Sequence, residues 1–127
     1  VSFFVPGIPR STQTGSIVRA GGRAFPVRRN TPWSALCGLY ARQYAPPEPA
    51  DGPLKVTMRF FFPRPKGQAK RAFPTVRPDL DGLQKGLLDS WNGVLWKDDA
   101  QIVELALKKD YAVGGWQPGV AVSVEGL

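Results

Sequence analysis

Hydrophobic and polar positions alternate most regularly over residues 54–62, which read LKVTMRFFF. The apolar positions Leu54, Val56, Met58, Phe60 and Phe62 fall on one side of an extended chain. A period of two is typical of a β-strand that turns one face to the core. Shorter apolar runs predict further strands over residues 1–5, 102–107 and 120–124.

Two other segments repeat their apolar side chains at the spacing of an α-helix. The first begins at Thr31-Pro32, an N-cap followed by proline at the first helical position, and runs to about Gln43. The second is predicted over Asp79–Trp91, with leucines on one face. Asn92-Gly93 follows it as a left-handed cap.

Two loops rich in basic residues separate these elements. Residues 10–30 form either a long loop or a hairpin with strands at 16–18 and 24–27, and residues 63–78 form a proline-punctuated loop without an acid. The order of elements predicts an α/β (α+β) fold in which a small mixed β-sheet has two main helices on one face. We expect a single domain over residues 1–127.

Composition removes several kinds of chemistry. The chain has no histidine and one cysteine, Cys37, which excludes catalytic triads, histidine-bound metals, a disulfide framework and a cysteine-based zinc site. No apolar run reaches the ~18 residues of a membrane span, and no segment resembles a signal peptide. We therefore expect a cytoplasmic protein without a membrane partner, whose chemistry comes from carboxylates, lysines or hydroxyls.

The net charge of +7 is unevenly distributed. Residues 1–77 hold 13 of the 17 basic residues and only two acids. A basic surface of this kind attracts a polyanion such as nucleic acid, although it also aids solubility. The candidate DNA contacts are in the two basic loops: Arg19, Arg23, Arg28, Arg29, Arg64, Lys66, Lys70, Arg71 and Arg77.

Four carboxylates form the candidate catalytic site. Asp79 and Asp81 stand where the second helix begins, and Asp98 and Asp99 lie in a later turn that the chain can bring back to the same end. Clustered carboxylates suit a hard cation, Mg²⁺ or Mn²⁺, and such a metal beside a basic surface is what phosphodiester hydrolysis needs. Lys85, one turn after Asp81, would neutralise charge on the phosphate.

Each of these residues also has a structural interpretation. Asp79 is a good N-cap, and Asp81 complements the helix dipole. Asp81 and Lys85 are spaced as an ordinary i,i+4 surface pair. Asp98 and Asp99 are common turn residues.

The segments RPDLDGLQKGLLD (77–89) and WNGVLWKDDAQIV (91–103) resemble the signature of the RusA family of Holliday-junction resolvases. The family pattern is a D-x-D-N-x-x-K helix, an Asn-Gly turn and a W-x-D-D-x-Q-[IV] stretch. The chain departs from the family in two places. Gly82 replaces the asparagine after D-x-D, and residues 11–14 (STQT) replace a basic cluster after the opening Val-Pro-Gly-x-Pro.

The resemblance implies a small homodimeric endonuclease that uses Mg²⁺. By this resemblance, the catalytic metal ligands are Asp79, Asp81 and Asp99, and Asp98 is a further candidate ligand. The catalytic lysine of the family corresponds to Lys85. The expected reaction is the resolution of four-way DNA junctions by paired symmetric nicks, for which a twofold dimer is the natural arrangement. Two alternatives stay open: a broader nuclease for branched or flap DNA, and a non-catalytic nucleic-acid-binding module of the same fold.

Overall fold

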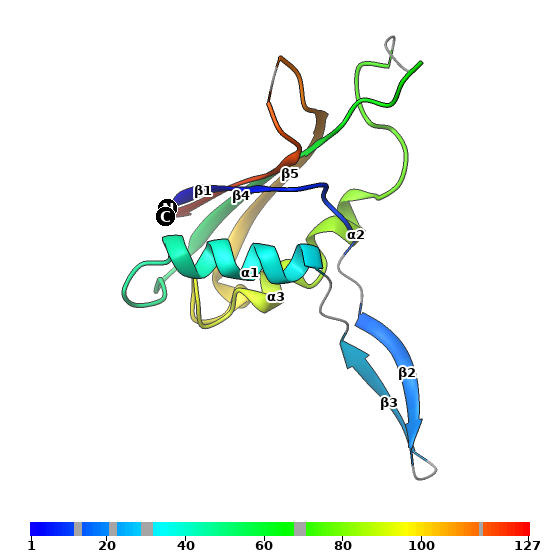
Figure 1. Cartoon of the computed structure of the whole chain (residues 1–127). Coiled ribbons are helices and arrows are strands. Elements are labelled where there is room, and N and C mark those ends of the chain that lie inside the picture. The colour runs from blue at the N-terminus through cyan, green and yellow to red at the C-terminus, as the bar shows by residue number, and fades with distance from the viewer. Residues whose placement is uncertain (12–13, 21–22, 29–31, 68–70, 115) are drawn as a thin grey trace.

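The computed structural model describes residues 1–11, 14–20, 23–28, 32–67, 71–114 and 116–127, with only the backbone of 14–20 and 23–28. A four-stranded sheet has the order β1-β6-β4-β5. Its strands are β1 (Ser2–Pro6), β4 (Leu54–Phe62), β5 (Ile102–Tyr111) and β6 (Gly119–Gly126). The mixed sheet with helices on one face confirms the predicted fold class (Figure 1).

Strand β4 organises the sheet. It pairs antiparallel with β6 and parallel with β5, and all five of its predicted core residues are buried. The alternating pattern of residues 54–62 therefore gives both the bounds of the strand and the face that it turns to the core. Strand β5 extends four residues beyond the predicted end at Leu107, because it pairs with β4 as far as Tyr111.

Helix α1 (Pro32–Tyr44) packs across one face of the sheet and buries Trp33, Cys37 and Ala41 (Figure 1). The expected cap residue Thr31 lies outside the described residues. The termini lie side by side, where the amino group of Val1 donates to the carbonyl of Val124 at 3.1 Å.

A parallel pair of strands needs a crossover connection from the end of one strand to the start of the next. Residues 63–101 form this crossover between β4 and β5, and they include α2 (Leu80–Gln84), α3 (Leu87–Ser90) and the 3₁₀ turn η1 (Asp99–Gln101). The prediction of one helix over Asp79–Trp91 is wrong. Lys85 is extended and Gly86 has a φ of 87°, so the backbone breaks between α2 and α3.

The first basic loop is a hairpin of β2 (Thr14–Ala20) and β3 (Arg23–Arg28), which projects from the body of the protein (Figure 1). The hairpin interpretation of residues 10–30 is therefore the right one, with longer strands than the apolar runs indicated. In the described part of the chain, no helix is long and apolar enough to cross a membrane.

Candidate active site

Asp79 is the last residue of the loop that leads into α2. Its backbone is extended, and its Oδ1 accepts a hydrogen bond from the backbone N–H of Gly82 at 3.0 Å. This is the geometry of an N-cap, which satisfies one of the unpaired N–H groups at the start of a helix. The cap engages one carboxylate oxygen, so the second oxygen of Asp79 is available to a ligand.

Asp81 and Lys85 are linked through the backbone rather than through their charges. The N–H of Lys85 donates to the carbonyl of Asp81 at 3.0 Å, but ψ of Lys85 is 124°, outside the helical range. Because φ of Lys85 is −61° and this hydrogen bond is formed, Lys85 still completes the helical turn that begins at Asp81, although α2 itself ends at Gln84. Among the described residues, neither side chain forms an ion pair with the other.

The two carboxylates and the lysine nevertheless meet at one open, polar pocket of about 600 Å³, here called the Asp79 pocket. It is lined by Ser11, Arg77, Pro78, Asp79, Asp81, Gly82 and Lys85. Two acids and two bases therefore face a shared volume, an arrangement suited to a metal ion together with a phosphate.

Gly82 and Ser11 fit together at the wall of this pocket. A Cβ on residue 82 would lie 2.8 Å from Oδ1 of Asp79 and 2.9 Å from Oγ of Ser11. Both distances are shorter than real Cβ contacts, so a side chain at position 82 would displace one or both oxygens. Gly82, where the D-x-D-N pattern has asparagine, thus makes room for the hydroxyl of Ser11.

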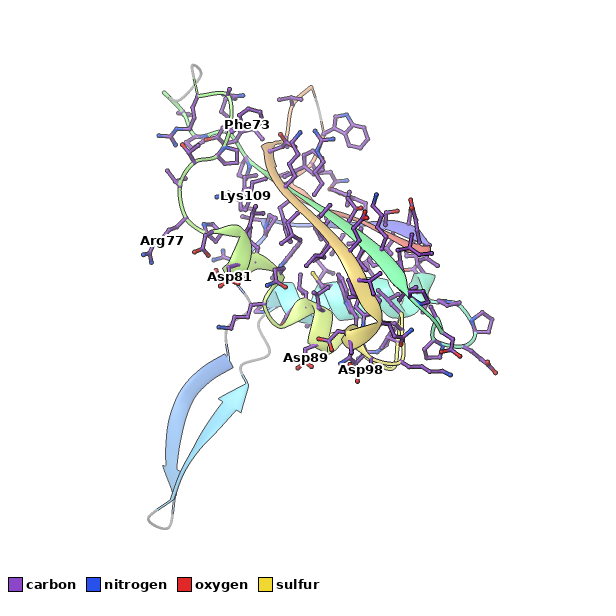
Figure 2. The ribbon with its side chains drawn as sticks, turned by 180° about the vertical axis from the view of Figure 1, so that it is seen from behind. Phe73, Arg77, Asp81, Asp89, Asp98 and Lys109 are labelled. Atoms are coloured by element: carbon purple, nitrogen blue, oxygen red, sulfur yellow. The ribbon has the colours of Figure 1, made fainter. Side chains whose placement is uncertain are left out.

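Lys109 of β5 fixes the loop that precedes Asp79. Its Nζ donates to the carbonyls of Val76 and Pro78, each at 2.9 Å (Figure 2). These bonds attach the loop to the C-terminal part of β5, where Lys109 pairs with Phe60 of β4. No motif singled out Lys109 in the sequence, because its role depends on strand register. The loop that carries Arg77 and Pro78 into the Asp79 pocket is consequently held against β5.

Asp98 and Asp99 belong to η1, directly before β5. Asp98 forms a capping box: its Oδ1 accepts from the N–H of Ala100 at 3.0 Å, while its own N–H donates to Oε1 of Gln101 at 2.9 Å. The bond from Ala100, followed by a bond with the Asp99 side chain, lowers the pKa of Asp98. Gln101 in turn donates to the carbonyls of Ala50 and Gly52, which anchors η1 beside the start of β4.

The two acidic pairs lie at opposite ends of the β4–β5 pair. Ile102, just after η1, is in register with Leu54 at the start of β4, whereas Lys109, which holds Pro78, is in register with Phe60 near its end. Figure 2 shows Asp81 and Asp98 well apart. Within the described residues, no group of three or more acidic or cysteine side chains is placed to hold a metal. The expected convergence of all four carboxylates within one chain is therefore wrong.

The predicted DNA contacts have different surroundings. Arg77 lines the Asp79 pocket, and Lys66 is exposed in the loop after β4. Arg64 places its guanidinium 4.5 Å from the centre of the Tyr111 ring and also donates to the carbonyl of Arg71. Arg29 and Lys70 lie outside the described residues. Arg19, Arg23 and Arg28 lie in β2 and β3, of which only the backbone is described.

The chain thus combines a small mixed sheet with a pocket in which two carboxylates lie beside a lysine and an arginine, in the crossover between two parallel strands. The family model described as Endodeoxyribonuclease RusA matches residues 6–125, and the chain belongs to this family. A relative in Bacillus subtilis (strain 168), "Uncharacterized protein YqaN", is 32% identical over 58% of this chain. The match spans 60% of that relative's length.

Proposed function

We propose that this protein is a Mg²⁺-dependent, structure-selective DNA endonuclease that resolves Holliday junctions by paired symmetric nicks. The Asp79 pocket is the observation that carries the proposal. Two carboxylates, a lysine and an arginine converge there in a chain of the RusA endodeoxyribonuclease family. Carboxylates suit a hard cation and cations suit a phosphate, so the pocket combines the two binding functions that phosphodiester hydrolysis requires.

Asp79 and Asp81 fit Mg²⁺, and also Mn²⁺, by the chemistry of their donors. Mg²⁺ is commonly held in proteins through one or two carboxylates, together with waters and substrate phosphates. The pocket supplies two carboxylates, and the described residues form no ion pair with either. A metal bound there would polarise the phosphate and lower the pKa of an attacking water.

The side chains of the pocket have separable tasks in this proposal. The bond from Gly82 fixes the orientation of Asp79. Arg77 holds the phosphate through charge-assisted hydrogen bonds, which are directional for a guanidinium. Lys85 places an ammonium where negative charge grows on the phosphate during attack, and such a donor acts most strongly in the transition state.

We further propose that the protein acts as a homodimer paired through β5. This strand is an edge of the sheet, and Val103 and Leu105 on it are 65% and 39% exposed. An exposed, apolar edge strand is a ready template for pairing with a second chain. A twofold dimer also presents two equivalent sites for two symmetric nicks.

Antiparallel pairing of β5 with its copy would account for Asp99 as a third metal ligand. In each chain Asp99 precedes the start of β5, and the Asp79 pocket adjoins its end through Lys109. A twofold axis across β5 reverses the strand direction, so the partner subunit's Asp99 would approach the Asp79 pocket. Substituting Leu105→Asp should then yield monomers in sedimentation and reduce cleavage. A dimer that persists unchanged would contradict pairing through β5.

The basic side chains of residues 63–78 and of the β2–β3 hairpin would bind the phosphate backbones on either side of the cut. Binding through several such contacts falls steeply as salt increases, because the protein releases counterions from DNA. The affinity for a junction is therefore expected to weaken by orders of magnitude between low and physiological salt. This dependence should be the same for wild type and for variants that alter only the metal ligands.

The test compares a synthetic four-way junction with a duplex of matched sequence, each with and without Mg²⁺. The proposal predicts paired nicks at symmetric positions in the junction, only with the metal, and no cleavage of the duplex. Equal cleavage of flaps and junctions would favour the broader branched-DNA nuclease. Binding without cleavage in Mg²⁺ or Mn²⁺ would favour a non-catalytic nucleic-acid-binding module.

A further inference from the structure

A second hollow adjoins the Asp79 pocket and has a different chemical character. It has a volume of about 430 Å³, within the ~300–1,000 Å³ of pockets that hold small molecules. Its walls are mostly proline rings and aromatic or aliphatic side chains, among them Pro9, Pro63, Pro74, Val76, Pro78 and Tyr111. We call it the Tyr111 groove.

The hydroxyl of Tyr111 is the unusual group in this groove. Tyr111 is only 5% exposed, and no atom of the described residues hydrogen bonds with its buried hydroxyl. Buried polar groups in proteins almost always have a partner, so an unpaired hydroxyl covered by the wall of a groove is suited to a ligand that displaces the side chains over it. The ring itself is held in place by the guanidinium of Arg64, 4.5 Å above it.

The groove adjoins the Asp79 pocket. Ser11, Arg77 and Pro78 line both hollows, so neighbouring units of one chain molecule can occupy the two. Arg10 and Arg77 stand at the groove as positively charged residues, and Lys109 fixes the wall between the hollows through Val76 and Pro78. An occupant should therefore be anionic along its length and flat and apolar at the point that enters the groove.

A nucleotide meets this description. Its phosphate suits the arginines, its base has two flat apolar faces that stack on rings, and the edge of the base carries hydrogen-bond donors and acceptors. We propose that the Tyr111 groove binds the unstacked base of a nucleotide next to the cut phosphate, and that this binding uncovers the Tyr111 hydroxyl, which then bonds to the edge of that base. This inference rests on the proposed function, since it takes the cut phosphate to lie in the Asp79 pocket.

The test uses four-way junctions that carry either a normal nucleotide or an abasic sugar on each side of the cut. Removing the bound base should weaken metal-free binding and slow single-turnover cleavage by about 10- to 100-fold, the range of base-stacking contributions. Tyr111→Phe removes only the hydroxyl. It should weaken binding of the intact junction about three- to tenfold and leave the abasic junction unaffected.

Two controls separate this role from a structural one. Tyr44→Phe makes the same change on α1, where the ring stacks on Phe3, and should alter neither junction. The melting temperature of Tyr111→Phe should equal or exceed that of the wild type, because the variant no longer buries an unpaired hydroxyl. A marked fall in the melting temperature would assign the hydroxyl a structural partner and overturn the proposal.

A bulky substitution in the groove provides an independent check. Val76→Trp should fill the groove and remove the difference between intact and abasic junctions, whereas Val113→Trp, at an exposed position outside both hollows, should preserve it. A wild type that treats intact and abasic junctions alike would overturn the groove proposal alone. A wild type that binds the junction but never cuts it would overturn the proposed function, while the binding data would still decide the role of the groove.

Discussion

Replacing Gly82 by alanine tests whether the position of the Asp79 carboxylate, and not only its charge, sets the rate of DNA cleavage. The new methyl group would stand 2.8 Å from Oδ1 of Asp79 and 2.9 Å from Oγ of Ser11. Since ordinary contacts begin at 3.4 Å, the oxygens must retreat by about half an ångström. A displacement of ~1 Å at a catalytic group can cost ~100-fold in rate, so we expect cleavage to slow about tenfold or more.

Folding should be little affected by the same change. Alanine stabilises a helical position by up to ~1 kcal/mol relative to glycine, while weakening the Asp79 cap costs ~1 kcal/mol. The free energy of unfolding should thus stay within about 1 kcal/mol of the wild type. The control is Gly38→Ala in α1, where among the described residues a new Cβ would meet only Nη1 of Arg42, at an ordinary contact distance of 3.8 Å. Single-turnover cleavage of a four-way junction within twofold of wild type for Gly82→Ala would refute this reasoning.

Three further predictions concern single side chains. Lys85→Ala should fold and bind junctions normally but cut ~10²- to 10³-fold more slowly, and Lys85→Arg should recover only part of that rate; single-turnover cleavage within threefold of wild type would remove Lys85 from the mechanism. Asp98→Ala should unfold more easily than wild type at pH 7, because the bond from Ala100 lowers the pKa of the Asp98 carboxyl. A carboxylate with a lowered pKa stabilises the fold above its ordinary value of 3.8, and this contribution disappears as the pH falls through the lowered pKa, so urea unfolding should show the two proteins converging in acid. Burial raises the pKa of the Cys37 thiol to about 12, so a thiol reagent at pH 8 should label Cys37 only after unfolding, and rapid labelling of the native protein would contradict its burial.

The parts of the fold that follow a local pattern could be predicted from the sequence. The alternation over residues 54–62 gave the central strand, and the D-x-D motif with its lysine indicated Asp79, Asp81 and Lys85, which share one pocket. The single helix over residues 79–91 was predicted because the leucine spacing continues across Gly86. Leu83 and Leu87 are both buried as that spacing requires, but the backbone turns at a glycine with positive φ.

The placement of Asp99 depended on information that no local pattern contains. Apolar runs identify β4 and β5 but do not show that they are parallel. Parallel pairing forces the crossover to run from one end of the sheet to the other, which separates Asp79 from Asp99. The Tyr111 groove and the role of Lys109 were missed for the same reason, since both are formed by residues that strand register brings together.

The most direct measurement of the central claim is Mg²⁺-dependent cleavage of a four-way junction by Asp81→Asn, with junction binding measured in parallel. The account predicts no cleavage by this variant and binding as tight as or tighter than wild type, because a charge that repels the phosphates is gone while the cations of the pocket stay. Asp89→Asn, on the exposed surface of α3, makes the same chemical change outside the pocket and should cut at the wild-type rate. Cleavage by Asp81→Asn at the wild-type rate would contradict the assignment of the Asp79 pocket as the active site.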